Sequence, residues 1–218
     1  MITMKQITEQ FSSATSRKTM WNESVEELIT QLAAPKGTVG ILYTSEDLAP
    51  FLGKMLDQLR LKTGVTDWAG ASGYGTISHT EEIFGESSAT VIVLDLPPDA
   101  YKVFSGNADV GTLLSDKEPE WLAEATMPLA ISHVDPRHTG AMDAISNLVE
   151  TTGSFLIGGL TAASSDSPHL VNAEKTCISG IAVSPMKAEI FTGLSQGCSP
   201  ISKTLTVTKA QQNIIIEL

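Results

Sequence analysis

Two short segments rich in glycine and hydroxyl side chains are the parts of this sequence best suited to hold a small ligand. Residues 70–75 read Gly-Ala-Ser-Gly-Tyr-Gly, and residues 158–165 read Gly-Gly-Leu-Thr-Ala-Ala-Ser-Ser. Glycine lets a ligand approach backbone N–H groups, which bind small anions such as carboxylates. The adjoining hydroxyl groups belong to Ser72, Tyr74, Thr161 and Ser164. These features favour a site for a small zwitterion or anion, although tight strand ends alone also use such glycines.

Neither segment matches a nucleotide-binding motif. The dinucleotide fingerprint is G-x-G-x-x-G at the start of a helix, whereas residues 70–75 read G-x-x-G-x-G and precede a β-like Thr-Ile-Ser. The sequence also lacks the phosphate-binding motif G-x-x-x-x-G-K-[ST]. We therefore expect no nucleotide cofactor, and no other cofactor is indicated.

A histidine-containing segment raises a metal-binding hypothesis. His133 and Asp135 alternate along an extended segment and would face one side, with His138 one turn further on. Three such ligands can hold a metal ion. The same residues also fit a strand end, an Asp-Pro turn and a helix start, where Asp135 accepts backbone hydrogen bonds. We favour this second interpretation and expect no metal.

The two cysteines, Cys177 and Cys198, are too few for a disulfide framework and have no C-x-x-C spacing. We expect both to be unpaired and at least half-buried. Residues 193–197 imitate the G-x-S-x-G nucleophile motif but lie between predicted strands, where no strand-to-helix elbow is expected. Cys198 would become a candidate nucleophile only if His169 or His79 lay beside it.

Composition narrows the class of partner. The 218-residue chain has 14 basic and 25 acidic residues, a formal net charge of −11, and no basic cluster of more than two residues. Nucleic-acid binding depends on lysine and arginine at phosphates, so we expect no nucleic-acid partner. The longest apolar runs, such as residues 154–163, are far shorter than a membrane span, and the first residues form no apolar signal stretch. We expect a cytoplasmic protein with no membrane partner.

Apolar periodicity predicts the elements that position the two glycine-rich segments. Ser24 and Glu27 suggest a capping box before a helix that ends near Leu32, and Asp47 suggests the cap of a second helix. The predicted elements of this part are a helix over 24–32, a strand over 39–43, a helix over 47–64 and strands over 65–71 and 90–96.

A shift of 89 positions aligns this part of the chain with a later part. It places the helix over 47–64 on residues 136–153, Gly70 on Gly159, and strand residues 91–94 on 180–183. We predict an α/β fold of two similar β-α-β-β halves, about 38–98 and 127–186. The halves would be related by pseudo-twofold symmetry, with packed sheets and helices outside. Such symmetry would let both glycine-rich segments line one cleft.

The remaining segments are assigned more simply. Residues 99–126 are polar and glycine-rich, with a short helix predicted over 118–125. Residues 189–196 and 204–218 have the apolar, β-branched character of strands, with a turn over 210–213. We therefore expect residues 1–218 to form a single domain in which 187–218 supply C-terminal strands.

Three motifs together resemble the FIST N domain family, named for F-box and intracellular signal transduction proteins. Two of them are the glycine-rich segments, of which the second is extended to begin at Ile157. The third is the end of the chain, which reads Gly-Cys-x-Pro-Ile over residues 197–201, then Val-Thr, and then Asn-x-Ile-x-Glu-Leu over residues 213–218. The ending is the most specific part, and the resemblance covers nearly the whole chain. It also implies that residues 11–16 are the first strand of the family fold.

The resemblance implies a small-ligand-binding sensory module coupled to signalling, with amino acids or similar small polar metabolites as ligands and no catalysis. It implies a C-terminal FIST domain or a signalling protein as partner, since family members usually continue past the Glu-Leu into such a domain. Gly73-Tyr74 stands where family members more often carry Thr-Ala. The candidate ligand-binding residues are Ser72, Gly73, Tyr74, Gly75, Gly158, Gly159, Thr161, Ser164 and Cys198.

Two other functions remain open from the sequence. One is a hydrolase or transferase that uses Cys198 or a histidine, which would turn over a metabolite. The other is a protein-interaction module without a ligand.

Overall fold

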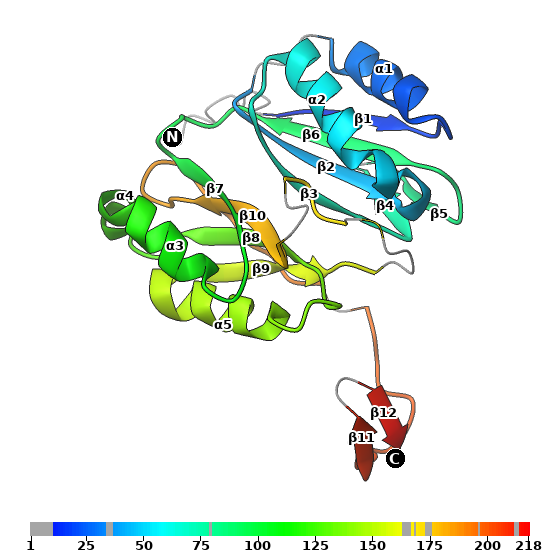
Figure 1. Cartoon of the computed structure of the whole chain (residues 1–218), viewed down its shortest axis with the longest axis vertical. Coiled ribbons are helices and arrows are strands. Elements are labelled where there is room, and N and C mark those ends of the chain that lie inside the picture. Colours follow the sequence, from blue (N-terminus) through cyan, green and yellow to red (C-terminus); the bar gives the residue numbers. More distant parts are fainter. Residues whose placement is uncertain are drawn as a thin grey trace, which may run out of the picture.

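The computed structural model describes residues 11–33, 37–78, 80–162, 167, 169–172, 176–195, 197–211 and 214–218. They form a mixed α/β fold with two four-stranded sheets and two small hairpins (Figure 1). Among these residues, no helix is both long and apolar enough to cross a membrane. The predicted α/β class is confirmed.

The first sheet has the strand order β1-β6-β2-β3. Its strands are β1 (Phe11–Ser16), β2 (Val39–Ser45), β3 (Asp67–Gly73) and β6 (Ala89–Leu94). Strand β6 is antiparallel to β1 and β2, and β2 is parallel to β3. The helices of this part are α1 (Trp21–Leu32), the 3-10 helix η1 (Glu46–Phe51) and α2 (Leu52–Thr63). A hairpin of β4 (Gly75–Ile77) and β5 (Glu82–Phe84) joins β3 to β6.

The second sheet repeats this arrangement in the order β7-β10-β8-β9. Its strands are β7 (Tyr101–Gly106), β8 (Leu129–Val134), β9 (Phe155–Leu160) and β10 (Ile178–Val183). Strand β10 is antiparallel to β7 and β8, and β8 is parallel to β9. Its helices are α3 (Val110–Lys117), α4 (Pro119–Ala125) and α5 (Ala141–Thr152). The two sheets therefore share strand order and direction, while the pseudo-twofold axis remains a prediction.

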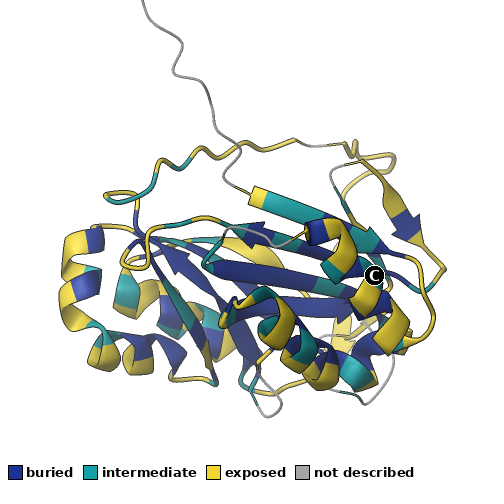
Figure 2. Ribbon diagram, turned by 90° about the horizontal axis from the view of Figure 1, so that it is seen from above, coloured by how far each residue is buried: buried dark blue, intermediate teal, exposed yellow. Residues whose placement is uncertain are grey.

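Three apolar clusters arrange the elements in four layers, helices outside and sheets inside (Figures 1 and 2). One cluster lies between α1, α2 and the first sheet, and a second between α3, α4, α5 and the other sheet. The third lies between the sheets and includes Ile41, Ala69, Tyr101 and Ile181. Figure 2 shows buried strands in the centre and helices exposed on their outer sides. The predicted packing of sheets with helices outside is confirmed.

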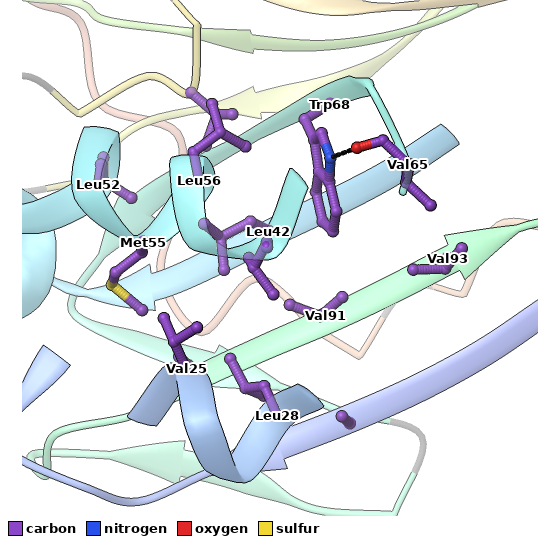
Figure 3. Packing of buried hydrophobic residues seen from close by; sticks show 14 of the residues in the cluster. Val25, Leu28, Leu42, Leu52, Met55, Leu56, Val65, Trp68, Val91 and Val93 are labelled. Carbon is purple, nitrogen blue, oxygen red and sulfur yellow. Dashed lines mark hydrogen bonds between the residues drawn. The ribbon is translucent and has the colours of Figure 1, made fainter. Parts of the chain in front are cut away.

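Trp68 is the largest fully buried side chain of the first cluster (Figure 3). Its indole Nε1–H donates a hydrogen bond to the Val65 carbonyl oxygen at 2.8 Å, so its polar atom is satisfied inside the apolar layer. Leu28 from α1, Met55 from α2 and Val91 from β6 belong to the same cluster. Burying each such side chain contributes about 1.5–3 kcal/mol to folding.

Glycine is required at one equivalent position in each parallel strand pair. Gly70 pairs with Leu42, and Gly158 pairs with Ser132. Their φ angles are +137° and +143°, and a Cβ added to either would overlap the carbonyl oxygen of its partner. The structure thus equates Gly70 with Gly158. The predicted alignment of Gly70 with Gly159 is wrong by one residue, because the second parallel pair has a different register.

Three helices differ from the prediction in where they begin or in whether they are continuous. Helix α1 begins at Trp21, whose ring stacks on Phe51 at 6.3 Å between centroids, so Ser24 lies inside the helix and caps nothing. The predicted helix over 47–64 is divided into η1 and α2, because Pro50 has no N–H to continue a regular helix. Helix α5 begins at Ala141, after a turn, instead of at residue 136.

The segment predicted to be a polar connection over 99–126 contains β7 and α3 as well as the expected α4. The glycine content of this segment indicated a loop, but Gly111 lies in α3, where an added Cβ would overlap the Asn147 carbonyl oxygen on α5. The glycine therefore permits close helix packing. Strand β1 lies over residues 11–16, as the family resemblance implied.

The C-terminal part is only partly as predicted. Strands β11 (Lys209–Gln211) and β12 (Ile214–Glu217) pair as a hairpin, which extends away from the two sheets in Figure 1. The strand predicted over 189–196 does not form among its described residues. Ile190 packs against the cluster between the sheets, whereas Phe191 and Leu194 are exposed and have no core to pack against.

Candidate functional site

A cavity of about 360 Å³ lies where the C-terminal ends of the two parallel strand pairs meet. Both glycine-rich segments contribute to it, one from β3 and one from β9. The lining residues are Tyr43, Ala71, Ser72, Gly73, Tyr74, Gly75, His133, Gly158, Gly159, Leu160, Thr161 and Ala162. The volume lies in the range of small-molecule sites, and the carboxyl ends of parallel strands are their usual place in α/β folds.

Tyr43 and His133 meet across the two sheets at this cavity. Each is the residue directly after the one that pairs with a strained glycine: Tyr43 follows Leu42, the partner of Gly70, and His133 follows Ser132, the partner of Gly158. The Tyr43 hydroxyl and His133 Nε2 are 2.8 Å apart, and the rings meet edge to face with centroids 5.3 Å apart. This hydrogen bond links the first sheet to the second beside the ligand space.

Burial keeps this pair uncharged. Desolvation lowers the pKa of His133 to about 4 and raises the pKa of the Tyr43 phenol. At neutral pH both groups are therefore neutral. Among the described lining residues there is no lysine, arginine, aspartate or glutamate. The cavity can bind a ligand through hydrogen bonds and ring contacts, without a charged partner from these residues.

Ser72 is held from the side by a segment of the second half. Its backbone N–H donates to the His169 carbonyl oxygen at 2.9 Å, and its hydroxyl lies 2.5 Å from His169 Nδ1. The Val171 N–H donates to the Gly70 carbonyl oxygen at 3.0 Å, and Ala71 forms a bridge with Leu170. Residues 169–171 thus close the outer edge of β3 and fix the Ser72 hydroxyl at the cavity wall.

The metal hypothesis is not supported. Asp135 accepts hydrogen bonds from the Arg137 backbone N–H at 3.0 Å and from its guanidinium at 2.9 and 2.6 Å. Mainly through these bonds, Arg137 lowers the pKa of Asp135. His138 Nδ1 accepts from the Gly140 N–H instead. Within the described part of the chain, no three histidine, cysteine, aspartate or glutamate residues are grouped so as to hold a metal ion.

Seven of the nine predicted ligand-binding residues line the cavity: Ser72, Gly73, Tyr74, Gly75, Gly158, Gly159 and Thr161. Ser164 lies outside the described residues, as does His79. Cys198 is exposed and is not among the lining residues, so its predicted burial is wrong and its part in ligand binding stays a prediction. It lies in the extended C-terminal segment, which has no core to hold it. Cys177 is buried, and both cysteines are free.

Sequence reasoning missed Tyr43 as a site residue and assigned His133 only to a metal. Both lie near the C-terminal end of the strand that pairs in parallel with a glycine-rich strand, and this shared place was a usable signal. Their contact was not predictable, because it depends on how two sheets from distant parts of the chain pack.

Residues 38–218, more than half of the chain, match the family model described as FIST N domain. No curated protein matches the chain.

Proposed function

This chain belongs to the FIST N domain family of signal transduction sensory domains, and we propose that its cavity between the two sheets binds a small polar metabolite. The observation that carries the proposal is that both glycine-rich segments, 88 residues apart at their strained glycines, line one cavity. A fold that needed these glycines only for tight strand ends would not need to bring them together.

The lining residues favour a small ligand with several hydrogen-bonding groups, such as an amino acid. Thr161 and Tyr74 supply hydroxyl groups, while Tyr43 and His133 supply ring faces and edges. Because the described lining is uncharged and the whole chain carries −11, long-range attraction does not assist an anionic ligand. Binding should therefore depend weakly on salt and strongly on local contacts.

The position of the cavity suggests how binding is sensed. A ligand beside the hydrogen-bonded pair of Tyr43 from the first sheet and His133 from the second contacts both sides of the sheet-sheet junction. Binding would favour one arrangement of the two sheets, and a C-terminal FIST domain or a signalling protein in the cytoplasm would respond to it. A protein of this kind does not convert its ligand.

Two glycines allow the cavity to be filled without disturbing the backbone. A Cβ added to Gly159 meets no atom within 4 Å, and one added to Gly73 meets only the Ala162 oxygen at 3.7 Å. Neither has a positive φ that would strain a substituted residue. Gly159→Val and Gly73→Val therefore fill the site from opposite sheets.

The test is a thermal-shift screen of amino acids and other small polar metabolites, followed by calorimetry on any compound that stabilises the protein. We expect one chemical class to raise the melting temperature of the native chain, and both valine variants to fold but lose this response. Ile77→Lys, an exposed position outside the cavity, is the matched control and should keep the response. Unchanged affinity in both folded valine variants, or turnover of the ligand, would contradict the proposal.

A further inference from the structure

Strand β9 ends the second sheet with an open edge. The Phe155 N–H donates to the Pro128 carbonyl oxygen and the Thr161 N–H to the Val134 carbonyl oxygen, so alternate residues of β9 point their backbone groups toward β8. The backbone N–H and C=O groups of Leu156, Gly158 and Leu160 consequently point away from the sheet. In the part of the chain that the structure describes, no hydrogen bond occupies this outward row.

The equivalent edge of the first sheet shows what such a row binds. On β3, the Gly70 carbonyl and the Ser72 N–H are paired with residues 169–171 in antiparallel fashion. Gly70 and Gly158 have nearly the same φ, +137° and +143°. The unusual backbone at this position is therefore compatible with an added antiparallel strand.

The open edge is apolar and carries no charge. Phe155, Ile157 and Leu160 are 50%, 39% and 57% exposed. Residues 153–165 contain no charged side chain, although the chain as a whole has a net charge of −11. Natural sheet edges are usually protected by charges, proline or a covering segment, because an unprotected edge pairs with another strand. Between two chains of this net charge, contact through an uncharged surface avoids the repulsion of like charges.

We infer that β9 pairs antiparallel with β9 of a second copy of this chain, joining the two second sheets into one continuous sheet. The sequence is self-complementary about Gly158: in this register Leu156 faces Leu160 of the second copy, and Ile157 faces its Gly159. Gly159 has no side chain that this isoleucine would meet across the strand pair. A twofold axis through Gly158 satisfies the outward row of both copies with the same contacts, as in other isologous dimers.

A hollow beside the strand supports this register. A cavity of about 270 Å³ between α5 and β9 is lined by Ile145, Leu156, Gly158 and Leu160, among others. Leu156 and Leu160 of the second copy lie on this side in the proposed pairing and would fill part of it. The apolar lining makes such filling favourable.

The test is the mass in solution of the full chain over a hundredfold range of concentration. We expect a dimer of twice the 23.1 kDa chain, and a monomer for Ile157→Lys, which places a charge opposite Gly159 of the second copy. Ile77→Lys makes the same change on the short strand β4, at a more exposed isoleucine, and should remain a dimer. Ile215→Lys tests the exposed C-terminal hairpin and should also remain a dimer.

Hydrogen exchange assigns the contact to the strand itself. The amides of Leu156, Gly158 and Leu160 should be protected in the native dimer and should exchange rapidly in Ile157→Lys. A monomeric native chain would overturn the inference, as would a dimer lost in Ile215→Lys but kept in Ile157→Lys. Because Ile157 does not line the ligand cavity, loss of the dimer with ligand binding intact would leave the proposed function standing.

Discussion

Strands β3 and β9 occupy the same place in two sheets of the same order, yet their environments are opposite. The five central residues of β3 are buried, and residues 169–171 close its edge. In β9 only Leu156 is partly buried. The comparison teaches that one glycine in each strand is needed for the fold, whereas Gly159 in the open surroundings of β9 lines the cavity and has no packing role.

The largest contrast is expected in the side chains that anchor the two strands. Trp68→Ala should reduce the free energy of unfolding by about 4 kcal/mol, because it empties a fully buried position on β3. Leu156→Ala, on β9, should cost about 1 kcal/mol, since this side chain is only partly buried. Urea denaturation measures both. Equal costs would show that the second sheet is as tightly anchored as the first.

Next in size is the effect of alanine at the strained glycines. Gly70→Ala and Gly158→Ala should each cost about 3 kcal/mol, because the positive φ and the overlap with a carbonyl oxygen are present in both strands. Gly159→Ala is the matched control and should change stability by less than about 0.5 kcal/mol. If Gly159→Ala destabilised the chain as much as Gly158→Ala, the equivalence of Gly70 with Gly158 would be wrong.

Stability should also depend on pH through His133, at the junction of the two sheets. Above pH 6.5 the imidazole is neutral in both states; below it, the unfolded chain binds a proton that the folded chain, with the pKa at about 4, does not. Stability should therefore fall by up to about 3 kcal/mol between pH 6.5 and 4. His133→Gln, which can still bond Tyr43, should lack this part of the loss. Parallel pH curves for the two proteins would contradict the buried neutral histidine.

The smallest effect concerns one hydroxyl group of the β9 side of the cavity. Thr161→Ala should weaken ligand binding by about 1 kcal/mol if its hydroxyl makes one neutral hydrogen bond, without changing the melting temperature of the free protein. Calorimetry with the compound found in the screen measures this. Ser72→Ala, unlike Thr161→Ala, should lower the melting temperature of the free protein, because the Ser72 hydroxyl is paired with His169. Equal changes of melting temperature in Thr161→Ala and Ser72→Ala would contradict the view that only the hydroxyl on the β3 side of the cavity supports the fold.

Much of this arrangement followed from local sequence patterns, and the rest depended on packing between distant segments. The apolar spacing of residues 52–63 predicted α2, a β-branched run predicted β6, and the shift of 89 positions predicted β10. The glycine-rich composition of residues 99–126 led to a wrong prediction, because Gly111 serves contact with α5, which no local pattern reveals. The glycine-rich segments identified most of the cavity. The Tyr43–His133 contact joins residues 90 apart in two sheets, so only the fold could reveal it.

The most direct test of the ligand cavity is to identify the small molecules that co-purify with the protein. Native chain, Gly159→Val, Gly73→Val and Ile77→Lys would be purified in parallel, denatured, and their released metabolites compared by mass spectrometry. We predict one small polar compound that is enriched with the native chain and Ile77→Lys and is absent from both folded valine variants. The same compound retained by both valine variants at the native level would place the ligand elsewhere and contradict the account.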